Sequence, residues 1–246
     1  ARVLLHGQNL ADTEPFAREL VEKEGLTLIH PYDDPAIVAG QGTVGLEMIE
    51  AEPALDAIVV PVGGGGLISG CAIAVKSIKP AIEVIAAEAA LYPSLYQRIR
   101  GLEQKVGGAT IADGIAVKTV GNTGFAAAGS LIDDVLLVGE PEIEQAICML
   151  VDIEKQVAEG AGATALADLV THPARFAGKK VGVVVTGGNI DTRLLAQVLN
   201  RGMVRSGRIL SLRIDITDVP GTLARVATVV GEAGGNIIEV HHQRLF

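Results

Sequence analysis

The most informative stretch of the sequence is Ala57-Ile-Val-Val-Pro-Val-Gly-Gly-Gly-Gly66, and an apolar segment, residues 67–78, follows it. A run rich in β-branched residues predicts a buried strand, and the segment after the glycines predicts a helix. The first N–H groups of a helix lack partners and its dipole favours negative charge, so the turn can bind an anion. Because glycine has no Cβ, a phosphate can approach the main chain closely. The stretch therefore predicts a phosphate site at Gly63, Gly64, Gly65 and Gly66.

Strand-like and helix-like segments alternate on both sides of this stretch. The expected strands are residues 2–6, 27–29, 56–62, 83–87, 134–138 and 180–186. The expected helices are residues 12–24, a helix that ends near Glu50 and whose start two glycines interrupt, and residues 67–78, 140–158, 164–170 and 191–200. Repeated pairs of this kind with apolar strands predict an α/β fold around a mostly parallel sheet. Residues 101–121 carry five glycines and no clear period, which predicts a functional loop.

Composition excludes several classes of protein. The net charge of −9 over 246 residues argues against a nucleic-acid partner, and no apolar run approaches the roughly 18 residues of a membrane span. Cys71 and Cys148 lack metal-ligand spacing, so we expect buried thiols in a reducing cytoplasm. Residues 2–6 already look like a strand with no leader or Met before them, and we expect the chain to be a fragment.

A dinucleotide site is the first alternative for the glycine turn, because the strand at 83–87 ends at Glu88, about 20 residues further on. The third glycine of the dinucleotide fingerprint would fall on Ile68 or Ser69 when the count starts at Gly63 or Gly64. A count from Gly65 reaches Gly70 only if Leu67 replaces the second glycine. The fingerprint fails, and a site for a single phosphate fits better.

Two further glycine clusters follow expected elements. Thr186-Gly-Gly-Asn189 ends a strand, and ligands of open α/β sheets lie at the carboxyl ends of strands, so both turns could face one site. The alternative is a plain turn in which the Thr186 hydroxyl bonds locally. Glu159-Gly-Ala-Gly162 would let backbone approach a flat ligand, or would form a tight helix–helix corner with Glu159 solvated.

Six motifs occur together in one order: His30-Pro-Tyr-Asp-Asp-Pro35, Ala39-Gly-Gln-Gly-Thr43, Pro61-Val-Gly-Gly-Gly-Gly-Leu-Ile-Ser-Gly70, Ala112-Asp-Gly114, Glu159-Gly-Ala-Gly162 and Thr186-Gly-Gly-Asn189. In this series the chain resembles the threonine ammonia-lyases, which are fold-type II pyridoxal-phosphate (PLP) enzymes alongside the serine racemases. The resemblance covers residues 1–205. It implies a tryptophan synthase β-like parallel-sheet domain that is incomplete at its N-terminus, with residues 1–30 a remnant of the small subdomain and residues 31–205 the large PLP-binding domain.

The resemblance also implies how the cofactor is held. The tetraglycine loop and Leu67 would bind the phosphate of PLP, which agrees with the anion site argued above. Thr186 would meet the pyridine nitrogen, and Gly114 and Glu159 would lie near the ring. A neutral hydroxyl cannot hold that nitrogen protonated as a carboxylate would, so β-elimination is favoured over transamination.

The implied reaction removes water from L-threonine, or from L-serine, by β-elimination, and hydrolysis of the resulting enamine then releases ammonia and, from threonine, 2-oxobutanoate. Isoleucine biosynthesis is the implied context. The family's Schiff-base lysine lies in a Ser-x-Lys motif and its substrate carboxylate in a Ser-Gly-Asn loop, and we expect both upstream of residue 1. We therefore assign no catalytic residue here and expect this polypeptide alone to be inactive. Lys76, Lys118 and Lys155 are expected on the solvated surface. A serine racemase or a hydroxyaspartate ammonia-lyase is the near alternative.

A metal site is a weak candidate. Family members that a divalent cation activates carry a carboxylate at the position of Glu88 and another a few residues later. Here Tyr92 and Ser94 occupy the following region, and one carboxylate is a poor ligand set for Ca²⁺ or Mg²⁺. We expect Glu88 to be structural.

The tail, residues 206–246, resembles part of an ACT regulatory domain. Expected elements are a strand at 209–217, a turn at 218–221, a helix at 222–233 and a strand at 236–244. The resemblance implies a branched-chain amino-acid effector, and the candidate contacts are Asp218, Gly221, Leu223, Asn236 and Ile237. An ordinary turn is the alternative. An incomplete module exposes an unpaired strand edge at 236–244, so we expect it to associate or to be disordered. We expect the protein to be a homo-oligomer. A non-catalytic amino-acid sensor that uses this tail is the alternative from another class.

Overall fold

The computed structural model describes residues 2–7 and 10–243. It divides into two compact units, residues 1–202 and 203–246, which are described separately. The first unit contains one parallel sheet with the strand order β3-β2-β1-β4. Its strands are β1 (Ala57–Pro61), β2 (Glu83–Ala89), β3 (Asp134–Val138) and β4 (Val181–Val183). The α/β class with a parallel sheet is confirmed.

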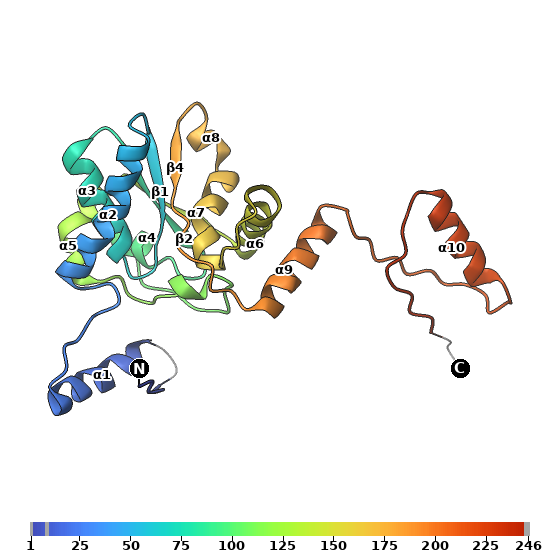
Figure 1. Cartoon of the computed structure of the whole chain (residues 1–246), viewed down its shortest axis with the longest axis horizontal. Coiled ribbons are helices and arrows are strands. Elements are labelled where there is room, and N and C mark those ends of the chain that lie inside the picture. The colour runs from blue at the N-terminus through green and yellow to red at the C-terminus, as the bar shows by residue number, and fades with distance from the viewer. Residues whose placement is uncertain (1, 8–9, 244–246) are drawn as a thin grey trace. The chain divides into compact units, whose positions relative to one another are not determined.

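Helices connect and cover these strands (Figure 1). The α-helices are α1 (Leu10–Glu24), α2 (Pro35–Ala51), α3 (Gly66–Ile78), α4 (Ser94–Ile99), α5 (Asn122–Ala128), α6 (Glu140–Met149), α7 (Gly160–Thr171), α8 (Pro173–Phe176), α9 (Thr192–Arg205) and α10 (Thr222–Glu232). Shorter helical turns are η1 (Asp113–Ile115), η2 (Gly129–Leu131) and the π-helical η3 (Leu150–Glu154).

The alternation of side chains along β1 builds two core layers. Helices α2 and α3 lie on one face of the sheet and α7 on the other (Figure 1). Ile58 and Val60 belong to the core cluster that contains residues of α2 and α3, whereas Ala57 and Val59 pack with Ala165 of α7. These four β1 residues are fully buried. A strand buried on both faces needs apolar residues at every position, which is the pattern of parallel sheets.

Helix α2 begins and crosses α3 through specific local chemistry. The Asp34 carboxylate accepts a hydrogen bond from Ala36 N (2.8 Å) and caps the helix, and Pro35 occupies its first position. The glycines expected to interrupt the start of this helix lie inside it instead. A Cβ on Gly42 would lie 2.9 Å from the Gly70 carbonyl oxygen, so these glycines allow α2 and α3 to touch backbone to backbone.

Several expected boundaries are wrong. Residues 2–6 and 27–29 form no strand. The helix expected at 140–158 ends earlier, because α6 runs into η3 and Lys155 then takes a left-handed conformation (φ 58°). Helix α7 begins four residues before the expected Thr164 and takes in the Gly160-Ala-Gly162 motif.

The second unit contains α10, as the periodicity predicts, but no strand among its described residues up to 243. The expected strands at 209–217 and 236–244 are therefore wrong as far as residue 243, and residues 244–246 lie outside the described part. None of the side chains of α10 is buried. Among residues 2–7 and 10–243, no helix is long and apolar enough to cross a membrane.

Candidate functional site

The tetraglycine loop lies at the carboxyl end of the central strand. It follows β1 directly and ends in the first turn of α3. Strand β4 runs parallel to β1 with Val183 opposite Val59, so the segment that carries Thr186 leaves the sheet at the same edge. The structure thus brings together the two turns that the sequence predicts to face one site.

The main chain of the loop has free donors. Within the described residues, no oxygen accepts a hydrogen bond from the N–H groups of Gly63, Gly64, Gly65 or Gly66. Gly65 caps α3 in the left-handed region (φ 89°), which an L side chain rarely adopts. Four unpaired amides at a helix N-terminus make an anion site, and a phosphate group fits this donor set.

Neighbouring segments press on the loop so closely that only glycine fits. A Cβ on Gly63 would lie 2.9 Å from Ile115 Cα, and one on Gly66 would lie 2.7 Å from the Tyr32 carbonyl oxygen. A Cβ on Gly64 would enter the Tyr32 ring. The loop is therefore fixed between η1 on one side and Tyr32 on the other.

A second contact zone joins the remaining glycine motifs. Glu159 precedes α7, and its N–H donates to the Gly187 carbonyl (3.0 Å) while its carboxylate lies over the Gly187 Cα. A Cβ on Gly114 would lie 3.1 Å from Ala161 Cβ and 4.0 Å from a Glu159 carboxylate oxygen. The structure thus groups Gly114, Glu159 and Gly187, and Glu159 is half-buried, so the fully solvated side chain of the alternative is not observed.

Thr186 is exposed. No hydrogen bond to its hydroxyl is found among the described residues, so the locally bonded turn is not what the structure contains. A free hydroxyl here can donate to a ring nitrogen of a bound heteroaromatic group. Leu67, the last predicted phosphate contact, is half-buried in the first turn of α3.

The motif that begins at His30 has a role that sequence reasoning missed. His30 Nδ1 accepts hydrogen bonds from the N–H groups of Tyr32 (3.2 Å) and Asp33 (2.7 Å). The Asp33 carboxylate in turn accepts from the N–H groups of Asn122 (3.0 Å) and Thr123 (2.8 Å) at the start of α5. Although partial burial acts the other way, these donors hold the pKa of Asp33 below its usual value. Asp34 caps the helix that follows it, which N-cap preferences could have revealed, whereas Asp33 caps the remote helix α5, which only the fold reveals.

Glu88 is fully buried at the end of β2. Its two carboxylate oxygens accept from Leu95 N (2.8 Å) and Tyr96 N (2.9 Å), the first turn of α4. Burial raises the pKa of Glu88 to about 7, and these two hydrogen bonds oppose the rise. The carboxylate is therefore engaged as a helix cap, and no group of three potential metal-ligating side chains occurs in the described residues.

The lysines singled out from the sequence differ in exposure. Lys118 and Lys155 are exposed, as expected, but Lys76 is largely buried and pairs with Asp133 (2.7 Å). One Ser-x-Lys sequence does occur, Ser77-Ile-Lys79, but it ends α3 and Lys79 Nζ donates to the Pro53 carbonyl (2.6 Å).

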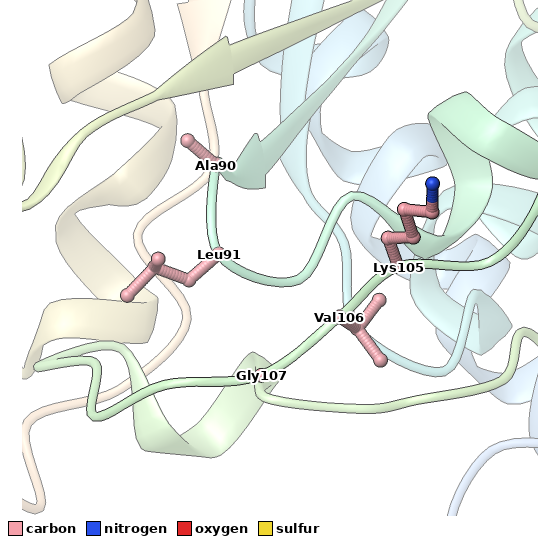
Figure 2. A pocket seen from close by; sticks show the side chains of 5 residues that line it. All are labelled: Ala90, Leu91, Lys105, Val106 and Gly107. Atoms are coloured by element: carbon pink, nitrogen blue, oxygen red, sulfur yellow. The ribbon is translucent and has the colours of Figure 1, made fainter.

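A separate pocket of about 530 Å³ lies just beyond β2 (Figure 2). Its lining consists of Ala90, Leu91, Lys105, Val106 and Gly107, none of them a predicted site residue. The long loop borders this pocket, and Gly107 N donates a hydrogen bond to Leu91 O (2.9 Å).

In the second unit, the predicted effector contacts do not form a buried site. Asp218, Gly221, Leu223, Asn236 and Ile237 are all exposed. A groove of about 640 Å³ beside α10 is lined by other residues, mainly Leu212, Ile214, Ile216, Val226, Val229 and Val230.

Comparison with known families identifies the grouped glycine motifs. The model of the family "Pyridoxal-phosphate dependent enzyme" matches residues 1–187, about three quarters of the chain. The chain belongs to this family. Pyridoxal phosphate is the cofactor of the family, and the free amides of the tetraglycine loop and the Thr186 hydroxyl fit its phosphate and its ring nitrogen.

Several relatives of this PLP-family chain are threonine-degrading enzymes. It is 41% identical over 246 residues to the L-threonine ammonia-lyase of Thermotoga maritima. This alignment covers 99% of this chain and 61% of that protein. A second L-threonine ammonia-lyase, from Geobacter sulfurreducens, is 41% identical with the same coverage. The chain thus spans about three-fifths of the length of these relatives.

Solved structures of the family share the fold. The serine racemase of Dictyostelium discoideum has a TM-score of 0.68 at 39% identity, over 76% of this chain and 61% of that one. The processed form of threonine deaminase isoform 2 from Solanum lycopersicum has a TM-score of 0.75 at 33% identity, over 82% of this chain and 57% of that one. The fold-type II PLP architecture expected from the motifs is confirmed.

Proposed function

We propose that this chain is the cofactor-binding part of a PLP-dependent threonine ammonia-lyase, which converts L-threonine to 2-oxobutanoate and ammonia and also accepts L-serine. The observation that carries the proposal is the row of four free amides at the N-terminus of α3 in a member of the PLP family. The relatives named L-threonine ammonia-lyase support the substrate.

Each site residue has a proposed task. Gly63, Gly64, Gly65 and Gly66, with Leu67, bind the cofactor phosphate through main-chain N–H groups, and the α3 dipole favours its negative charge. Thr186 donates its hydroxyl to the ring nitrogen, while Gly114 and Glu159 flank the ring. The bound cofactor supplies an electron sink for cleavage at the substrate Cα. The chain's own part in the reaction is to hold and orient that ring.

The finer features are proposals of the same kind. Residues 1–30 belong to a small subdomain, residues 31–205 form the large PLP-binding domain, and residues 206–246 are part of an ACT-like domain that binds a branched-chain amino acid. The similarity to the Thermotoga maritima protein runs over 99% of the chain and so includes most of this tail. We further propose a cytoplasmic homo-oligomer in isoleucine biosynthesis, with no membrane or nucleic-acid partner.

A direct assay tests this function. The complete protein, incubated with PLP and L-threonine, should form 2-oxobutanoate that lactate dehydrogenase or a hydrazine reagent detects. The 246-residue chain by itself should form none. Absence of any 2-oxo acid from the complete protein, or turnover by the isolated chain, would contradict the respective part of the proposal.

Serine racemase is the second candidate, because two solved serine racemases, at 39% and 34% identity, resemble this chain. The same incubation with L-serine separates the two. Chiral chromatography that finds D-serine as the main product, in place of pyruvate, would favour the racemase.

A further inference from the structure

We propose that Glu140 is a positioning residue that holds residues 110–115 against the tetraglycine loop and thereby sets the affinity for PLP. The inference rests on the proposed function, because it concerns the same cofactor site. Glu140 is the first residue of α6, and it lies outside every motif that the sequence resemblance singles out.

Both oxygens of the Glu140 carboxylate bind the same short segment. Oε1 accepts from the Thr110 hydroxyl (2.6 Å) and Oε2 accepts from Ile111 N (2.7 Å). The Thr110 hydroxyl also accepts from Ala112 N (3.1 Å). Hydrogen bonds to an ionised carboxylate are stronger and more directional than neutral ones, so this bidentate clamp fixes the position of the segment.

The clamped segment touches the two halves of the cofactor site. At one end, the Ile111 carbonyl packs directly on Gly160, and a Cβ on Gly114 would lie 3.1 Å from Ala161 Cβ. At the other end, Ile115 Cα would lie 2.9 Å from a Cβ on Gly63. Residues 110–115 therefore form a wedge between the phosphate loop and the start of α7.

The wedge determines how far apart the tetraglycine loop and the start of α7 lie, and the flat ring of the cofactor would lie between these two segments. If Glu140 releases it, the tetraglycine amides and Glu159 no longer keep a fixed separation. Binding groups act only when supporting residues lock their geometry. Both hydrogen bonds of Glu140 go to the wedge, and among the described residues none goes to the tetraglycine loop, so Glu140 acts through the wedge.

The test compares Glu140→Gln with Glu142→Gln in the complete protein. Both substitutions remove one carboxylate from the first turn of α6 and so weaken its dipole interaction equally, but only Glu140 holds the wedge. The readout is the dissociation constant of PLP, from a titration of the apoprotein followed by cofactor absorbance. Because displacement by a fraction of an ångström lowers binding and catalysis steeply, we expect Glu140→Gln to bind PLP about ten-fold more weakly. Glu142→Gln should stay within about two-fold of the wild type.

Thr110→Val provides the second variant, since it keeps the side-chain shape and removes one arm of the clamp. It should also raise the dissociation constant of PLP. In the double variant Glu140→Gln, Thr110→Val, the fold-increase in this constant should be smaller than the product of the two single fold-increases, because the two residues share one interaction. Equal dissociation constants for Glu140→Gln, Glu142→Gln and the wild type would overturn the inference and leave the proposed function intact. A wild-type protein that does not bind PLP would overturn both.

Discussion

Helices α3 and α10 begin in the same way but differ in how deeply they are buried. Helix α3 follows Pro61-Val-Gly-Gly-Gly65 and α10 follows Val219-Pro-Gly221, and each is capped by a glycine in the left-handed region, with φ 89° at Gly65 and 88° at Gly221. Yet α3 is largely buried, whereas α10 has no buried residue. A Cβ on Gly65 would lie 2.9 Å from Val120 Cγ1, and one on Gly221 would meet nothing within 4 Å.

A glycine turn before a helix is a local property, whereas an anion site also needs walls, that is, neighbouring residues that fix the turn. Around α3 the walls are Tyr32, Ile115 and Val120, which fix the loop from three sides. Around Gly221 no such wall is found in the described part of the chain. The turn and its walls together support a site at α3, whereas the turn before α10 has no such walls among the described residues and does not by itself make an effector site.

Truncating a buried side chain in α3 should lower the stability far more than truncating an exposed one in α10. Ile68 is 1% exposed in α3, so Ile68→Ala should destabilise the first unit by about 4 kcal/mol, through lost transfer free energy and a cavity. Val229 in α10 is 63% exposed, and Val229→Ala should change stability by less than about 0.5 kcal/mol. Urea unfolding followed by circular dichroism measures both. Similar losses for the two variants would contradict the contrast.

The next effect concerns pH and the cap of α4. Burial raises the pKa of Glu88 from 4.5 to about 7, so the folded chain keeps this proton to higher pH than the unfolded chain does. Below the unfolded value both states are protonated and nothing is lost. As the pH rises from about 4.5 to about 7, the free energy of unfolding falls by up to about 3 kcal/mol, and it stays lower at higher pH.

Glu88→Gln should remove this dependence. The difference in unfolding free energy between the variant and the wild type should move in favour of the variant by about 3 kcal/mol from about pH 4.5 to about pH 8. Glu239→Gln is the control, because that side chain is 71% exposed in the second unit and lacks the burial that causes the effect. A Glu88→Gln difference that stays constant with pH would refute the assignment.

A smaller effect compares the two capping glycines. Gly65→Ala should cost about 2 kcal/mol, because a left-handed conformation is unfavourable for alanine and the new Cβ meets Val120. It should also weaken PLP binding in the complete protein. Gly221→Ala carries the same backbone strain without the clash, and it should leave both PLP affinity and the stability of the first unit unchanged. Loss of PLP binding on Gly221→Ala would break the distinction.

The smallest effect tests how α2 supports the site. Asp34→Ala removes the side-chain cap and should cost about 1 kcal/mol of stability, with PLP affinity little changed. Asp34→Asn keeps an acceptor and should recover most of the loss. Thermal unfolding of the three proteins decides, and an unchanged midpoint for Asp34→Ala would show that the cap contributes nothing.

Sequence reasoning succeeded where local chemistry and fold agree. The β-branched run before Gly63 predicted a buried strand, which β1 confirms, and the repeated strand–helix pairs predicted that the turns after β1 and β4 share an edge of a parallel sheet. It failed where tertiary contacts decide. Alternation at 209–217 predicts a strand, but a strand needs a partner, and no strand forms among the described residues of the second unit. The role of Glu140 could not be predicted from the sequence, because a glutamate at the start of a helix is common. Only the fold places it against Thr110 and Ile111.

The central claim is that the amides at the start of α3 bind the phosphate of PLP. Two-dimensional ¹⁵N–¹H spectra of the protein labelled with [¹⁵N]glycine, recorded during a titration with PLP, test it most directly. We predict that the amide signals of Gly63, Gly64, Gly65 and Gly66 shift in a saturable manner while that of Gly221 does not. Unmoved tetraglycine signals at saturation with PLP, or a shift at Gly221 instead, would contradict the account.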